Sequence, residues 1–514
     1  MKYPAIIAMT VSLLLSTLAP SPTTAQPTQP QAIRGWNVTG HGSWGSNWLF
    51  ADAIRKASGF GSGWTLEQMP GLSRVDTRDG LPLRNGKRSI ILHSQHGNPA
   101  PTGRYVLTWE GQGTAQVRAT GGGGARRVAQ QPNRITYEIG AGVDSLMVLL
   151  SGNVYDPHLW MPGAEGKMWN PAAIGALQGA AVLRFMDWTE TNRAKQTTWD
   201  TRPLPHSLYQ GTEAGVAWEH CIDLAVAVDA EPWLNIPAKA DADYCRQLGK
   251  LLSDICPPDM RVRVEFGGNE YWNSAAGFKD NARQFFVKDY TPHPDNNQGQ
   301  FHPATAYAHR MAWQAAALAE TFPRERTTRV VSAHTASSWW AKTTTAELAL
   351  LGVDWDELAC TFYFGSLHDI DAPALGLPAQ GEAGKDAFFA SVMAAIADGS
   401  QYAGAEAHAA IARQHGKQMV FYEGGSHARY YGGDEAIKKW YLAINRDPRM
   451  ALAVAENSRQ VRQRFPSAVQ CFFTDAAFYD DGKVGIFGAI DGRNDQWNAP
   501  TRNAKWKAFV EATR

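Results

Sequence analysis

Two patterns of apolar and polar positions divide the chain. Between about residues 80 and 152, short runs that alternate apolar and polar residues are separated by glycine, which is typical of antiparallel strands packed as a sandwich. From about Leu183 onward, apolar strand-like runs alternate with helical stretches, and that order predicts a parallel sheet. The sandwich runs are 89–94, 104–111, 114–120, 134–140 and 145–152.

The parallel strands can be counted. Apolar runs of strand length lie at 182–188, 233–237, 261–270, 328–334, 359–365, 418–425 and 469–475. An eighth lies near the N-terminus at 35–42, followed by a helical stretch over 48–57. Eight strands complete a closed barrel, so we predict the α/β class and a (β/α)8 TIM barrel with an antiparallel β-sandwich inserted near the N-terminus. The alternative is an open doubly wound sheet, although no Walker-type loop follows any of these strands.

The first residues have the pattern of an export signal. Lys2 precedes an apolar stretch over 5–18, which is too short to cross a hydrocarbon core of about 30 Å. We therefore expect a secreted or periplasmic protein without membrane contact once the signal is removed. The expected divisions are a signal peptide over 1–25, a linker over 26–33, the first barrel strand and helix over 34–60, the sandwich over 61–155 and the remaining barrel over 156–514.

Charge and cysteine usage exclude several classes of protein. The chain has 49 basic and 49 acidic residues, so it lacks the excess of basic residues with which nucleic-acid binders neutralise phosphates. Five cysteines without a CxxC pair argue against a zinc cluster. They leave disulfides open, with a bridge among Cys221, Cys245 and Cys256 as one option. Since neither HExxH nor GxSxG occurs, we expect no metal or cofactor and no nucleophilic-serine chemistry.

Two carboxylates end predicted barrel strands. Glu270 ends the fourth strand and Glu423 the seventh, and the carboxyl ends of barrel strands form the active-site face. Two carboxyl groups about 5 to 5.5 Å apart suit retaining glycoside hydrolysis. Asn269 is placed to donate a hydrogen bond to a substrate hydroxyl, and Gly424 and Gly425 leave a ligand room beside Glu423. The structural alternative for either glutamate is a carboxylate that caps a helix or pairs with an arginine.

These residues carry a family resemblance. Gly-Asn-Glu at 268–270, followed by Tyr271 and Trp272, together with Glu423 on the seventh strand, resembles the clan A retaining glycoside hydrolases. The resemblance covers the barrel, and members of the clan often add a β-sandwich. It implies that Glu270 is the acid/base and Glu423 the nucleophile.

Further residues are expected near this pair. Tyr363, near the end of the sixth strand, lies where clan A enzymes often place a tyrosine that hydrogen-bonds the nucleophile, and His334 ends the fifth strand, where the clan frequently has a histidine. Arg184 in the second strand needs a partner, because an unpaired buried arginine is costly; it can orient the nucleophile or pair with Asp187. The other residues expected to contact substrate are Asn235, Trp188, Trp272 and His427.

The sequence therefore predicts an exported, cofactor-free retaining glycoside hydrolase. Its expected partner is a poly- or oligosaccharide, such as a plant or microbial β-glycan, whose sugar rings can stack on indole side chains. One alternative is a catalytically inactive carbohydrate-binding or scaffold protein on the same fold. Another is an inverting hydrolase or a lyase, which needs a wider carboxyl separation or a different base.

Overall fold

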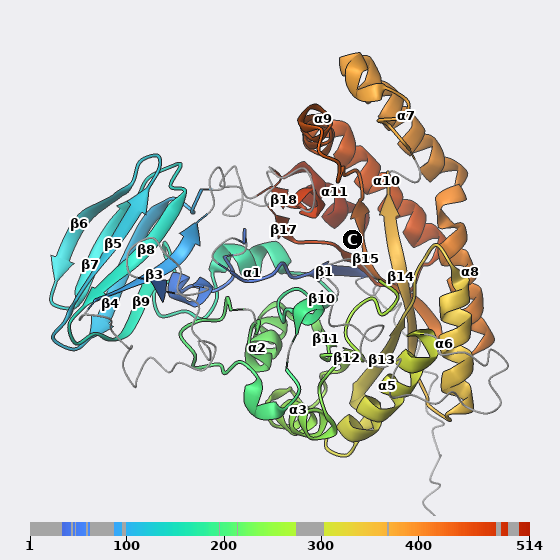
Figure 1. Cartoon of the computed structure of the whole chain (residues 1–514), viewed down its shortest axis with the longest axis horizontal. Coiled ribbons are helices and arrows are strands. Elements are labelled where there is room, and N and C mark those ends of the chain that lie inside the picture. Colours follow the sequence, from blue (N-terminus) through green and yellow to red (C-terminus); the bar gives the residue numbers. More distant parts are fainter. Residues whose placement is uncertain are drawn as a thin grey trace, which may run out of the picture. The chain divides into compact units, whose positions relative to one another are not determined.

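The protein was analysed as a computed structural model, which describes residues 33–42, 45–46, 48–57, 60–61, 87–94, 99–194, 196–212, 214–273, 303–366, 370–477, 479, 485–491 and 503–514. Eight parallel strands close into a barrel (Figure 1), which confirms the predicted fold class. In their order around the barrel the strands are β1 (Arg34–Asn37), β10 (Val182–Arg184), β11 (Glu231–Asn235), β12 (Val262–Glu265), β13 (Thr327–Ser332), β14 (Glu357–Phe364), β15 (Gln418–Ser426) and β16 (Gln470–Phe472). The expected signal peptide and nearly all of the linker lie outside the described residues.

Strand β1 closes the barrel. Gly35 is in register with Val182 of β10 on one side and with Cys471 of β16 on the other. A side chain at Gly35 would overlap the Cys471 sulfur, so a glycine is needed where these strands meet. Every residue of β1, β10 and β16 is buried, as expected for a parallel sheet covered by helices.

The helices outside the barrel begin at recognisable caps. The Asp241 side chain accepts a hydrogen bond from the backbone N–H of Tyr244 at 2.7 Å, which satisfies a donor that the first helical turn leaves unpaired. Within the described residues we find no helix with the length and apolar character that a membrane span requires. The helices are α1 (Pro171–Leu177), α2 (Trp218–Val228), α3 (Ala242–Ile255), α5 (Pro303–Ala319), α6 (Ser338–Leu350), α7 (Gly381–Asp398), α8 (Ala403–Gln414), α9 (Glu435–Arg446), α10 (Pro448–Arg464) and α11 (Ala504–Ala512).

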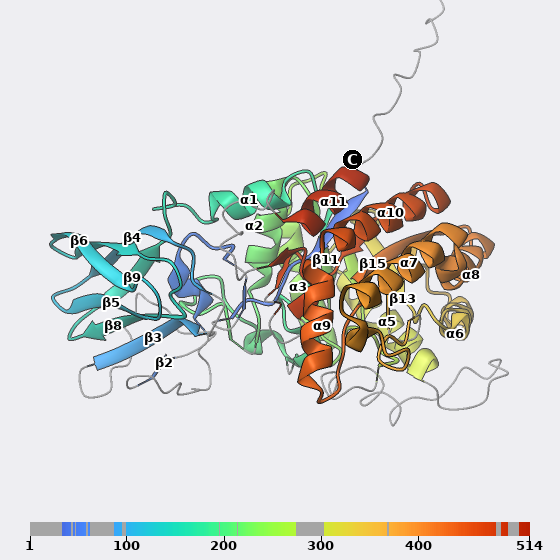
Figure 2. The same cartoon turned by 90° about the horizontal axis from the view of Figure 1, so that it is seen from above.

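Between β1 and β10 the chain forms two antiparallel sheets, which lie in separate layers in Figure 2. Buried residues alternate with more exposed ones along β4 and β7, as expected when one face of a sheet covers a core. Strand β6 is almost entirely exposed, which explains why its sequence gave no apolar alternation. One sheet holds β2 (Phe60–Gly61), β3 (Lys87–Ser94), β8 (Ser145–Ser151) and β5 (Thr114–Thr120), and the other β6 (Ala125–Gln131), β7 (Arg134–Ile139), β4 (Gly103–Glu110) and β9 (Tyr155–Trp160).

The segment after β1 differs from the predicted helix over 48–57. It contains only a short 3-10 helix, η1 (Ala53–Lys56). The Ala51 backbone bonds instead to the chain that follows the sandwich, donating to the Met168 carbonyl at 2.9 Å and accepting from the Met161 N–H at 2.8 Å. Because backbone groups used in this pairing are not available to a helix, tertiary contacts override the local helical pattern.

A buried carboxylate joins this segment to the sandwich. Asp52 accepts hydrogen bonds from the backbone N–H groups of Ile54 at 3.0 Å and Leu159 at 2.9 Å. Its second oxygen lies 2.8 Å from Nδ1 of His158, and Nε2 of that imidazole lies 3.2 Å from Asp156. Although burial lowers the pKa of His158, the two aspartates raise it to about 9, so an ion-paired imidazolium holds the junction.

The five cysteines all lie within the described residues. Each is buried and none forms a disulfide, so the bridge considered among Cys221, Cys245 and Cys256 does not occur in this structure. Their side chains serve as small apolar groups, a common role for free cysteine in protein cores.

Candidate active site

The first four barrel strands all end in a buried polar residue. These residues are Asn37 on β1, Arg184 on β10, Asn235 on β11 and Glu265 on β12, and at most 1% of the surface of each is exposed. The carboxyl ends of parallel barrel strands lie on one face. Four polar side chains therefore meet at the face where barrel enzymes carry their active sites.

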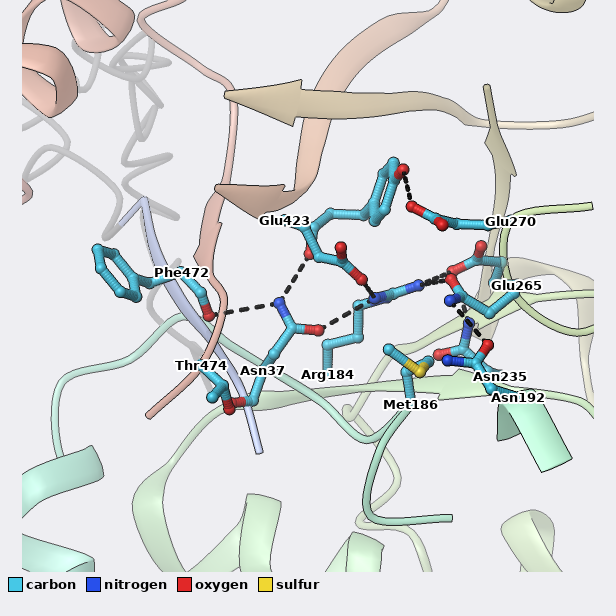
Figure 3. Close-up of polar contacts among 12 residues, drawn as sticks. Asn37, Arg184, Met186, Asn192, Asn235, Glu265, Glu270, Glu423, Phe472 and Thr474 are labelled. Atoms are coloured by element: carbon cyan, nitrogen blue, oxygen red, sulfur yellow. Dashed lines mark hydrogen bonds and ion pairs between the residues drawn. The ribbon is translucent and has the colours of Figure 1, made fainter. Parts of the chain in front are cut away.

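Arg184 is the centre of this group. Its Nη1 donates to Oδ1 of Asn37 at 3.0 Å and to Oε1 of Glu423 at 2.9 Å. Its Nη2 donates to Oε2 of Glu265 at 2.9 Å and to Oδ1 of Asn269 at 2.8 Å. Figure 3 shows Glu423 and Glu265 at the two ends of the guanidinium. One arginine thus connects the first, second, fourth and seventh barrel strands.

The partners of Arg184 settle one of the alternatives left by the sequence. Although burial lowers the pKa of Arg184, Glu265 and Glu423 raise it above its ordinary value. The guanidinium forms no ion pair with Asp187 and instead binds Glu423, as expected for an arginine that orients this carboxylate. The planar fork of arginine suits such a position, because it donates in two directions at once.

Glu423 lies within β15, and only 6% of its surface is exposed. Besides the Arg184 contact, its Oε2 accepts a hydrogen bond from the Tyr363 hydroxyl at 3.0 Å, the contact that the family resemblance implied. Burial and the nearby charge of Glu270 raise the pKa of Glu423, while Arg184 and Tyr363 lower it. The first two effects prevail, so the site retains a proton more readily than an isolated carboxylate would.

A β-bulge allows two neighbouring residues of β15 to reach the site. Opposite β14, Phe421 pairs with Cys360 and Glu423 with Thr361, so Tyr422 is an extra residue between them. In a regular strand Tyr422 and Glu423 would point to opposite faces, whereas a bulge redirects the side chains. The Tyr422 hydroxyl consequently donates to Oε1 of Glu270 at 2.9 Å. In Figure 3 a dashed line that ends at Glu270 marks this hydrogen bond.

Glu270 follows its strand and does not end it, which corrects the predicted strand boundary. Strand β12 ends at Glu265, and the turn after it contains Gly267, Gly268 and Glu270 in the left-handed region, with φ of 71°, 88° and 42°. Such backbone is unfavourable for a non-glycine residue and occurs often at functional sites. The second oxygen of Glu270 accepts a hydrogen bond from Nδ2 of Asn273 at 2.7 Å.

Two of the expected asparagines bind protein groups. Asn269 is 2% exposed; besides accepting from Arg184, it donates to Oδ1 of Asn192 at 3.0 Å. Asn235 donates from Nδ2 to Oε2 of Glu265 at 2.7 Å. In these contacts both side chains hold the network around Arg184 in place.

The aromatic and imidazole residues divide into two groups. The Trp272 ring lies 6.0 Å from the His334 ring and 6.4 Å from the Tyr422 ring, measured between centroids. Burial lowers the pKa of His334, and Glu270 opposes that effect. On the Glu423 side, the His427 ring lies 5.0 Å from the Tyr363 ring. These residues therefore surround both glutamates.

Trp188 has a different environment from the one expected of a substrate-binding residue. Its side chain is fully buried and its ring packs against a cluster of aromatic rings, so it offers no open face to a sugar. The rings packed around Trp188 are His41, Phe50, Trp169 and Phe185.

The structure gives a packing reason for Gly424 and Gly425 in place of the expected access for a ligand. A side chain at Gly424 would overlap the Phe362 ring, and one at Gly425 would overlap the Phe472 ring.

Sequence reasoning missed Asn37, Glu265 and Tyr422. A signal existed for Glu265, because a charged residue inside the apolar run 261–270 needs a buried partner, and Arg184 has the opposite charge. No comparable signal marked Asn37. Tyr422 could not be found by alternation along the strand, since the bulge breaks that alternation.

Comparisons with known proteins find distant similarities to solved structures. No protein-family model matches the chain, and no curated protein matches it. Among solved structures, the chain is similar to a family 51 alpha-L-arabinofuranosidase from Bifidobacterium longum, with a TM-score of 0.40 and 12% identity over 68% of each chain.

Two further solved structures are similar at the same level. The match to the GH51 arabinofuranosidase from Xanthomonas axonopodis pv. citri has a TM-score of 0.34 and 12% identity over 58% of each chain. A fungal beta-1,4-galactanase matches with a TM-score of 0.28 and 10% identity over 65% of this chain and 92% of that one. Similarities this distant say nothing about the reaction, so the function is argued from the site itself.

Proposed function

We propose that the protein is an exported retaining glycoside hydrolase in which Glu423 is the nucleophile and Glu270 the general acid and base. One observation carries the proposal. Two carboxyl groups lie at the same face of the barrel, the charge of Glu270 acts on Glu423, and their hydrogen-bond partners differ. Retaining hydrolysis needs one ionised and one protonated carboxyl group at the same pH.

The partners support this assignment of roles. Glu423 accepts from a guanidinium and a phenol, and both donors stabilise a carboxylate. Glu270 instead accepts from the neutral donors Tyr422 and Asn273, and the mechanism needs this second carboxyl group to carry the proton.

The reaction follows from these positions. The Glu423 carboxylate attacks the anomeric carbon and forms a glycosyl ester, while Glu270 gives its proton to the departing glycosidic oxygen as the bond from carbon to that oxygen breaks. Glu270 then takes a proton from water, and the water oxygen attacks the anomeric carbon and releases Glu423. Two displacements preserve the anomeric configuration. The substrate is a poly- or oligosaccharide, and the N-terminal pattern of Lys2 and the apolar stretch supports export.

The stereochemistry of azide rescue tests both roles together. In Glu423→Ala, azide has room to attack the anomeric carbon directly, so we expect a glycosyl azide of inverted configuration. In Glu270→Ala the covalent intermediate still forms from substrates with good leaving groups, and azide should release it as a glycosyl azide of retained configuration. Proton NMR of the products distinguishes the two anomers.

Control variants define the outcomes. Glu456→Ala removes a glutamate on α10, far from the strand ends in sequence, and should leave the rate and the retained product unchanged. Full activity in Glu423→Ala without azide would contradict the nucleophile assignment. The same anomer from both azide reactions would contradict the division of roles.

A further inference from the structure

Arg429 is a half-buried cation beside the candidate site. It follows β15 by three residues, and its guanidinium lies over the Tyr431 ring at 4.1 Å and over the Phe487 ring at 5.0 Å. Its Nε is buried without a hydrogen-bond partner. Among the described residues its side chain makes neither a hydrogen bond nor an ion pair. Two aromatic rings therefore fix the position of a guanidinium whose N–H donors bond to none of the described residues.

Ring contacts connect Arg429 with the nucleophile side of the site. Phe487, which Arg429 covers, lies 5.8 Å from the Tyr363 ring and 5.6 Å from the His427 ring. The Tyr363 hydroxyl in turn donates to Glu423. Burial lowers the pKa of Arg429, and Tyr363, Glu270 and Glu423 act in the opposite direction. The charges of Glu270 and Glu423 thus act on Arg429, although it forms no hydrogen bond or ion pair with either carboxylate.

An arginine in this state is costly unless it binds something. A guanidinium nitrogen removed from water needs an acceptor, because an unmade hydrogen bond to a charged group destabilises the protein. Arg184 meets this need with four acceptors. Arg429 has none among the described residues, so a ligand is able to supply acceptors for its guanidinium.

We propose that Arg429 binds an anionic substituent, a carboxylate or a sulfate ester, on the sugar next to the bond that is cleaved. The substrate class is then an acidic glycan. This inference rests on the proposed function. Carboxylate and sulfate both present the pair of oxygens that a guanidinium binds with two parallel hydrogen bonds. An anion also needs a local cation to approach Glu270 and Glu423, and Arg184 has already used both of its terminal nitrogens.

The test compares matched neutral and acidic substrates. Aryl glucosides and galactosides would be assayed against the corresponding aryl uronides and against 6-sulfated aryl glycosides, which separate carboxylate from sulfate recognition. We expect the protein to prefer one acidic series. Arg429→Gln should lower kcat/KM on that series about 10- to 100-fold and change kcat/KM on neutral substrates by less than about threefold. Arg429→Lys should restore part of the loss.

Binding gives a readout that does not need activity. In Glu423→Ala, calorimetry would measure the affinity for neutral, uronic and sulfated oligosaccharides with and without Arg429→Gln. Arg126→Gln, which removes an exposed arginine from β6, is the control for overall charge, and thermal unfolding checks that the variants are folded.

The outcomes separate this inference from the proposed function. Absence of hydrolysis together with Arg429-dependent binding of acidic oligosaccharides would overturn the reaction and support the subsite. Equal losses on neutral and acidic substrates in Arg429→Gln, or binding of neutral oligosaccharides alone, would overturn the subsite whether or not Glu423 is the nucleophile.

Discussion

The imidazolium at the junction between the first barrel strand and the sandwich leads to a quantitative prediction. The His158 side chain is 26% exposed and that of Asp52 5% exposed, so solvent screens their attraction only in part. His158→Gln removes the charge but keeps a polar side chain of related size. The variant leaves Asp52 with its two backbone N–H donors but without the imidazolium that pairs with it.

The magnitude follows from the raised pKa. His158 has an ordinary pKa of 6.5, which the junction raises to about 9. A tenfold change in proton affinity corresponds to about 1.4 kcal/mol, so the protonated imidazole stabilises the folded state by about 3 kcal/mol at most. For a pKa raised on folding, this stability is fully present below about pH 6.5 and is lost as the pH rises through about 9. His158→Gln should therefore destabilise the protein near pH 6 and have little effect near pH 10.

Urea unfolding followed by circular dichroism measures this difference. The free energy of unfolding would be determined for the native sequence and for His158→Gln at about pH 6 and about pH 10. We expect the native protein to lose up to about 3 kcal/mol more than the variant between these two pH values.

A double-mutant cycle identifies the partner of His158. Asp52→Asn keeps an oxygen acceptor for Ile54 and Leu159 but removes the negative charge, and it should reduce the same pH dependence. Combined with His158→Gln it should cost less than the sum of the single changes, since both remove one interaction. If the native protein and His158→Gln lose equal stability between the two pH values, the ion pair does not hold this junction.

Three further predictions concern the site. Arg184→Lys replaces two terminal nitrogens by one ammonium nitrogen, which cannot span the four acceptors of the guanidinium. It should therefore lower the free energy of unfolding by about 3 kcal/mol and kcat by at least about tenfold; native values in urea unfolding and steady-state kinetics would contradict this. Tyr363→Phe removes a donor that lowers the pKa of Glu423, so the acidic limb of the kcat/KM profile should move to higher pH, and an unmoved limb would show that the hydroxyl does not act on the nucleophile. Gly424→Ala should destabilise the protein by about 1 to 3 kcal/mol through overlap with Phe362, and Gly352→Ala, where no atom lies within 4 Å of an added side chain but φ is 66°, separates this overlap from backbone strain.

The barrel could be predicted because its strands carry a local signal. Each buried parallel strand appears as a short apolar run, and eight such runs correspond to the eight strands of the barrel. The sandwich strands β3, β4, β5, β7 and β8 were visible in the same way, whereas β9 and the exposed β6 were not. The local pattern of segment 48–57 predicted a helix. Its backbone pairs instead with residues about a hundred positions later, and no local pattern contains that information.

The site was predictable where a residue lies near the carboxyl end of a predicted barrel run, although Asn37 and Glu265, which end their strands, were missed. Strand order placed Glu270 and Glu423 on one face, and the structure brings Arg184 and Tyr363 to Glu423 as expected. Trp188 shows the limit of this reasoning, since the end of a strand does not reveal whether a ring faces the site or packs beneath it. Side-chain direction depends on bulges and on left-handed turns, such as those at Tyr422 and Glu270, which neither periodicity nor composition encodes.

The buried charges explain how one proton stays at the site. Arg184 carries a single positive charge and contacts two carboxylates, Glu265 and Glu423, at 2.9 Å each. Glu265 therefore takes part of the attraction that would otherwise hold Glu423 ionised under all conditions. Burial and the negative charge of Glu270 raise the pKa of Glu423, so this carboxyl group binds a proton at a higher pH than an isolated one would. Glu265, which is completely buried, thus shares the cation that orients the nucleophile.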